Sequence, residues 1–183
     1  MSSGSSHSCS SVVSKPKLNF TGAPVFDALD PDSPAFWYRL GTAILCGGII
    51  GLERQLRGKA AGIRTSILIC LGTELFVSLG ASFEGDRVDP TRVLAQVVTG
   101  IGFLGGGVIL SREGAVTGVT SAAVIWVLAA LGSMIGLGHL PAAVILTLIT
   151  VALLLGVELL ESIFRRLRQG AQEREISKIE LED

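Results

Sequence analysis

Five long apolar stretches run along the chain, and short polar segments separate them. The stretches cover residues 35–52, 63–83, 93–110, 116–137 and 140–157. A helix that crosses a bilayer needs roughly 20 residues, with a usable range of about 17–25. The pattern therefore predicts an all-α polytopic membrane protein, a bundle of about five transmembrane helices. Because the separators are short, consecutive helices should be antiparallel and in contact.

The basic residues in the polar segments predict the orientation of this bundle. Most Lys and Arg near helix ends fall in the first and third separators and in the tail after the fifth stretch: Arg54, Arg57, Lys59, Arg64, Arg112, Arg165, Arg166 and Arg168. Such residues collect on the cytoplasmic side. We therefore expect the N-terminus outside and the C-terminus in the cytoplasm. Trp37 and Tyr38 fit the outer aromatic belt, with Arg39 snorkelling beside them.

The two ends of the chain differ in composition from the membrane domain, which we expect over residues 35–160. Residues 1–34 are Ser-rich and predict a disordered N-terminal tail. Residues 161–183 predict a short charged cytoplasmic tail, with mobility beyond Gly170. The apolar residues Leu160, Ile163, Phe164 and Leu167 indicate that the fifth helix runs on along the headgroups, and the alternative is a frayed, solvated exit. The pair Asp89-Pro90 predicts the start of the third helix, as an N-cap followed by proline in the first turn.

Composition excludes several classes of function. Of the 183 residues, 49% are hydrophobic and 17% are charged, whereas a soluble domain carries roughly a quarter charged residues. The net charge of -1 argues against a nucleic-acid partner. His7 and His139 are the only histidines, and no Ser or Cys has a recognisable base at motif distance, so we expect no enzyme and no cofactor. Cys46 and Cys70 lie in apolar stretches and are expected to be core residues.

Pairs of glycines four residues apart recur on three of the predicted helices. The pairs are Gly47 and Gly51, Gly102 and Gly106, and Gly132 and Gly136. Small residues at this spacing let helices pack closely in lipid. The alternative is that a chain with 23 glycines produces such pairs by chance. We expect the closest packing at the third helix, where glycines are most crowded.

Glu74 lies near the middle of the second predicted helix. A charge there costs about 2.5–3.5 kcal/mol on insertion scales. One reading is that Glu74 binds a proton or a cation, which makes it the candidate metal site. The other is that Glu74 is protonated and makes one interhelical hydrogen bond. On the third helix Arg92 lies at the outer mouth and Gln96 one turn inside, where Glu74 or Ser78 could bond Gln96. The alternatives are an interface anchor for Arg92 and helix–helix contact for Gln96.

The first separator forms a charged cluster around Glu53, Arg54 and Arg64. It could bind anionic lipid headgroups or nucleotide phosphates, or could simply orient the protein. Arg64 opens the second helix, where a cation opposes the helix dipole, and Glu53 is the expected partner that offsets it.

Several segments together resemble the bacterial MgtC/SapB membrane family over about residues 37–160. They are Gly51-Leu52-Glu53-Arg54, Ala61-Gly62-Ile63-Arg64-Thr65, Asp89-Pro90-Thr91-Arg92, the run from Gln96 to Gly107 and the run from Val119 to Trp126. The resemblance marks as functional candidates Glu53, Arg54, Gly62, Arg64, Thr65, Asp89, Arg92, Gln96, Gly100, Gly102, Phe103, Gly105, Thr120 and Trp126, beside Glu74 from the analysis above.

The resemblance implies a multi-pass protein of the bacterial inner membrane, linked to magnesium limitation and, in some members, to virulence. Members are often labelled magnesium transporters, but the role that the resemblance implies is a regulator of other membrane machinery, including the ATP synthase. Two features depart from the family. Only about 25 residues follow the fifth stretch, so a soluble C-terminal sensing domain is not expected, and Glu74 stands where a small or apolar residue is expected.

Two functions follow as hypotheses. The first is a regulator of magnesium homeostasis that contacts other membrane proteins through its glycine-lined faces. The second is a channel or transporter for magnesium or another cation. Mg²⁺ takes octahedral oxygen ligands and loses its water reluctantly. Only Glu74 lies at depth, so a pore would need a homo-oligomer that places several copies around an axis.

Overall fold

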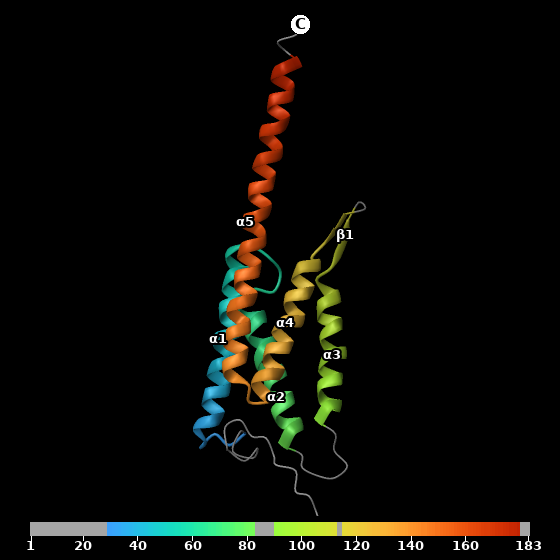
Figure 1. Cartoon of the computed structure of the whole chain (residues 1–183). Helices are drawn as coiled ribbons and strands as arrows, with labels where there is room; N and C mark the ends of the chain where they lie inside the picture. The colour runs from blue at the N-terminus through green and yellow to red at the C-terminus, as the bar shows by residue number, and fades with distance from the viewer. Residues whose placement is uncertain (1–28, 83–89, 113–114, 180–183) are drawn as a thin grey trace, which may run out of the picture.

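The computed structural model describes residues 29–82, 90–112 and 115–179. In these residues the chain forms five α-helices and one two-stranded antiparallel hairpin (Figure 1). The elements are α1 (Pro34–Leu56), α2 (Ile63–Ser82), α3 (Pro90–Gly107), β1 (Leu110–Arg112), β2 (Ala115–Thr117), α4 (Val119–Gly136) and α5 (Leu140–Ile179). The helices run alternately in opposite directions, and the predicted all-helical bundle of five helices is confirmed.

Four of the helices in the described residues are long and apolar enough to cross a membrane. They are α1, α2, α4 and the part of α5 from Leu140 to Leu160. Helix α3 is 18 residues long but is not among them. Its sequence explains the difference, because Arg92, Gln96 and five glycines lower its apolar character.

The hairpin was not predicted. The apolar pattern extended the third helix to residue 110 and began the fourth at 116, but α3 ends at Gly107 and α4 begins at Val119. Between them Leu110 pairs with Thr117, and Gly118 turns the chain into α4 with a φ of 90°. Hydropathy alone cannot distinguish a short apolar strand from the end of an apolar helix.

Helix α5 continues past the predicted apolar stretch. Its apolar part was expected to end at residue 157, followed by either a helical continuation along the headgroups or a frayed exit. One continuous helix of 40 residues runs through Gly170 and extends far beyond the bundle (Figure 1), which agrees with the helical continuation, while the mobility expected beyond Gly170 stays a prediction. Glu, Arg and Gln favour the helix almost as well as apolar residues do, so the end of hydrophobicity did not mark its end. Most of the predicted N-terminal tail, 1–34, lies outside the described residues.

The core forms where α1, α2 and α4 pack together. A Cβ atom on Gly51 would lie 2.6 Å from the Ile63 Cα atom, and one on Gly132 would lie 2.5 Å from the Cys70 carbonyl oxygen. Carbon atoms do not approach so closely, so only glycine permits these two helix contacts. Gly47 and Gly136 make similar approaches. Two of the three predicted glycine pairs are thus confirmed as close-packing sites.

The third glycine pair behaves differently. Added Cβ atoms on Gly102 and Gly106 of α3 would meet nothing within 4 Å. The prediction that α3 makes the closest contact is therefore wrong within this chain, because Gly102 and Gly106 meet no neighbouring helix and Gly105 makes only an ordinary contact with Trp126 of α4. Cys46 and Cys70 have no exposed surface, as expected of core residues.

The three basic segments lie at one end of the molecule. The α1–α2 turn, the hairpin and the extended part of α5 all lie at the same end (Figure 1). This grouping is what the alternation of helix directions required. That this end faces the cytoplasm stays a prediction.

Candidate functional site

A charged cluster links three helices at the basic end of the bundle. Arg54, at the C-terminal end of α1, is only 2% exposed. Its guanidinium donates hydrogen bonds to the Ser121 hydroxyl on α4 and to the Ala60 carbonyl oxygen, the latter at 3.2 Å. The buried cation therefore fixes the α1–α2 turn against the start of α4.

Glu53 and Arg57 extend this cluster to α5. The Arg57 Nε atom lies 2.6 Å from Glu53 Oε1, and the same guanidinium pairs with Glu158 on α5. The expected partner of Glu53 was Arg64, and that expectation is wrong. Arg57 lies four residues after Glu53 on the helix end and so reaches the carboxylate first, while Arg64 is exposed at the start of α2.

A cavity of about 430 Å³ lies beside the charged cluster, between α1, α4 and α5. Its lining includes Glu53, Arg54, Lys59, Thr120, Ser121 and Glu158 at one end, and Val124, Val127, Leu153, Leu154 and Val157 along the rest. Glu53 is 8% exposed, and its Oε2 atom is buried without a hydrogen-bond partner in the described part of the chain. One polar atom beside the cavity is thus left unsatisfied.

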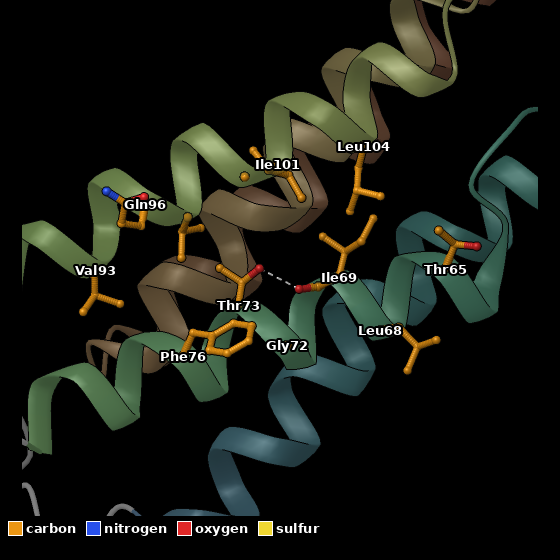
Figure 2. A pocket seen from close by; sticks show the side chains of 12 residues that line it. Thr65, Leu68, Ile69, Gly72, Thr73, Phe76, Val93, Gln96, Ile101 and Leu104 are labelled. Atoms are coloured by element: carbon orange, nitrogen blue, oxygen red, sulfur yellow. Dashed lines mark hydrogen bonds between the residues drawn. The ribbon is translucent and has the colours of Figure 1, made fainter.

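A second cavity, of about 610 Å³, lies between α2 and α3 (Figure 2). Ile101 and Leu104 of α3 face Ile69 and Thr73 of α2 across this cavity. The Thr73 hydroxyl donates a hydrogen bond of 2.7 Å to the Ile69 carbonyl oxygen of its own helix. The lining is almost entirely apolar, and Gln96 brings the one side-chain amide. Helix α3 therefore stands partly away from α2.

Glu74 lies on the face of α2 that packs against α4, and it is 3% exposed. Its Oε1 atom accepts a hydrogen bond of 2.8 Å from Ser78. Arg39 donates to the Ser78 hydroxyl at 3.3 Å and to the Gly136 carbonyl oxygen at 3.0 Å. Glu74 lines neither of the two cavities.

These contacts correct two expectations. Gln96 was expected to bond Glu74 or Ser78, but those two side chains bond each other and Gln96 lies at the α2–α3 cavity. Arg39 was expected to snorkel beside Trp37 and Tyr38. It turns inward instead, because the Ser78 hydroxyl and the last carbonyl of α4 accept its hydrogen bonds.

The structure places the remaining motif residues at the two cavities, at two close contacts and on the outward side of α3. Thr120 lines the smaller cavity with Glu53 and Arg54, while Thr65 and Gly100 line the larger one with Gln96. Gly105 of α3 packs close to Trp126 of α4, and Gly62 packs against the Gln55 side chain. Arg92, Gly102 and Phe103 lie on the outward side of α3, and Asp89 lies outside the described residues.

Sequence reasoning missed three participants. Ser121 lies within the Val119–Trp126 segment, but the resemblance of this segment to the family gave Ser121 no role of its own. Glu158 is a charge close to the end of an apolar stretch, which was a usable signal. Arg39 gave no signal, because its partners lie 39 and 97 positions away.

The fold and these sites define a multi-pass helical membrane protein that carries a buried charge cluster at one end. This chain belongs to the MgtC family, whose sequence profile matches residues 40–163. Among the described residues no group of three or more His, Cys, Asp or Glu is placed to hold a metal ion.

Two curated relatives illustrate the similarity. YhiD of Escherichia coli strain K12, named as a candidate magnesium transporter, is 47% identical over 110 residues, 56% of this chain and 51% of that protein. Protein MgtC of Brucella abortus strain 2308 is 43% identical over 136 residues, 72% of this chain and 56% of that protein. The chain thus spans about half the length of the curated relatives it matches. No solved structure matches it.

Proposed function

We propose that this protein is a regulator in the bacterial inner membrane, linked to magnesium homeostasis, that acts by contacting other membrane proteins. The observation that carries the proposal is the outward side of α3. We define this open face as Gly102, Phe103 and Gly106 with the neighbouring Thr99.

The open face has the chemistry of a helix-docking surface. Added Cβ atoms on its glycines would meet nothing within 4 Å, and Phe103 is 84% exposed. Small residues let a second helix approach closely in lipid, and amide or hydroxyl groups hydrogen-bond across such a contact. The Gln96 amide lies beside this face, at the α2–α3 cavity, and lipid tails offer this exposed amide no partner. A transmembrane helix of another protein satisfies both features, and the family resemblance makes the ATP synthase one candidate.

Transport of magnesium or another cation is the second candidate function, and the name of the YhiD relative favours it. The position of Glu74 argues against the form considered from sequence, a ring of Glu74 side chains in a homo-oligomer. This carboxylate is 3% exposed and bonds Ser78 inside the packed bundle, so copies of it cannot meet around an axis without unpacking the helices.

Site-specific photo-cross-linking in native membranes tests the proposal. A photoreactive residue at Phe103 should capture a discrete membrane protein, whereas the same residue at Leu148, 57% exposed on α5, should not. Gly102→Leu should abolish the Phe103 adduct by filling the open face. Adducts between copies of this chain would show that the partner is a second copy of the protein. Lipid adducts alone at both positions would overturn the proposal.

A further inference from the structure

The smaller cavity has a charged end and an apolar wall, and both signs of charge are present at the charged end. Glu53 and Glu158 supply carboxylates, and Arg54 and Lys59 supply cations. The wall consists of valines and leucines from α4 and α5. At about 430 Å³ the cavity has the size of an ordinary small-ligand site. Such an amphipathic cavity fits a zwitterionic molecule with an apolar tail.

The charged end lies at the level where the helices leave the apolar layer. Glu53 belongs to the last turn of α1, Ser121 to the first turn of α4, and Glu158 to the end of the apolar part of α5. These helix ends belong in the headgroup region of a bilayer. The wall opens outward, since Leu153 is 62% exposed and Val157 is 53% exposed. A lipid can therefore enter from the side, with its headgroup at the correct depth.

One oxygen of the Glu53 carboxylate lacks a hydrogen-bond donor among the described residues. Arg57 occupies its Oε1 atom, while Oε2 is buried and has no hydrogen-bond partner among the described residues. A buried polar oxygen without a partner is unfavourable, and native structures usually supply one. Because Glu53 lines the cavity, a bound ligand with an N–H group can complete this carboxylate.

The cations at the same end suit a phosphate. The Arg54 guanidinium is held in place by Ser121 and the Ala60 carbonyl oxygen, and the exposed Lys59 stands in the adjoining turn. Guanidinium and ammonium groups are the usual protein partners of phosphate oxygens. Because Arg57 already pairs with Glu53 Oε1 and Glu158, a ligand with a phosphate and a nearby ammonium matches the two cations and the remaining Glu53 Oε2 atom.

We propose that this cavity binds a phospholipid with a primary ammonium headgroup, of the phosphatidylethanolamine type. Its phosphate faces Arg54 and Lys59, its ammonium donates to Glu53, and one acyl chain covers the valine and leucine wall. A trimethylammonium headgroup has no N–H to donate. A glycerol headgroup can donate a hydroxyl but carries no positive charge, so its bond to the Glu53 carboxylate is the weaker one. The site stands independently of the regulatory role proposed above.

Native mass spectrometry of the purified, delipidated full chain in detergent tests this site. The probes are phosphatidylethanolamine, phosphatidylcholine and phosphatidylglycerol with identical acyl chains. We expect phosphatidylethanolamine to be retained about tenfold better than the other two, the ratio expected from one charge-assisted hydrogen bond. Glu53→Gln should remove this preference. Lys59→Glu should also weaken retention, and its exposed position protects the fold.

The matched control is Glu74→Gln, which alters a buried glutamate outside both cavities and should leave retention unchanged. Equal retention of the three lipids would overturn the assignment, as would unaltered selectivity in both Glu53→Gln and Lys59→Glu. Preference for phosphatidylglycerol would indicate a site for phosphate alone. Free phosphoethanolamine that binds as tightly as the lipid would show that the wall contributes nothing, and would equally contradict a lipid site.

Discussion

Glu53 and Arg54 are neighbours in sequence, yet their side chains have different roles. Arg54 turns inward and joins α1 to α4, while Glu53 faces Arg57 and the smaller cavity. The resemblance to the family marked both residues, but it could not assign these roles. The error over Arg64 has a simple cause, because a partner four residues along a helix end is closer than one across a turn. The Arg39 contacts depend on the packed bundle and could not be read from sequence.

Replacing Arg54 tests its role directly. Arg54→Ala removes charge-assisted hydrogen bonds to Ser121 and the Ala60 carbonyl, which are worth about 1.5–3 kcal/mol each when a buried group loses its partner. We expect a clear fall in the thermal unfolding temperature of the detergent-solubilised protein. Arg64→Ala is the control, since Arg64 is exposed and should change stability by less than about 0.5 kcal/mol. Equal effects of the two substitutions would contradict a structural role for Arg54.

At the scale of the elements, hydropathy predicted the number of helices well and their ends less well. The apolar stretches mark α1, α2, α4 and the first part of α5 because those segments must match an apolar solvent. The hairpin and the long extension of α5 lie beyond that constraint. Their backbones are set by turn geometry at Gly118 and by helix propensity, which hydropathy does not report.

Glycine substitutions measure which helix contacts are close. Gly132→Ala places a Cβ atom 2.5 Å from the Cys70 carbonyl oxygen, so α4 must move from α2. Overpacking of this kind costs about 1–3 kcal/mol and should lower the unfolding temperature. Gly41→Ala in α1 meets nothing within 4 Å and should be neutral or slightly stabilising. Similar losses in both variants would show that α2 and α4 are not in close contact.

On the scale of the whole molecule, the bundle is asymmetric. Helices α1, α2 and α4 bury Gly51, Gly132 and several polar side chains against one another, whereas α3 leaves Gly102, Gly106 and Phe103 on the outside. The sequence predicted that glycine faces would matter but not which of them the chain itself covers. That distinction depends on how α3 is placed by its contact with α4 near Gly105 and Trp126. The uncovered face is the basis for a function through contact.

Magnesium flux measured on the purified chain separates contact from transport most directly. The protein is reconstituted into sealed vesicles that contain a magnesium-sensitive dye, and magnesium is added outside. A regulator should give no dye response above that of empty vesicles, with or without Glu74→Gln. A magnesium-dependent response that exceeds empty vesicles and is lost in Glu74→Gln would contradict this account and identify the protein as a transporter.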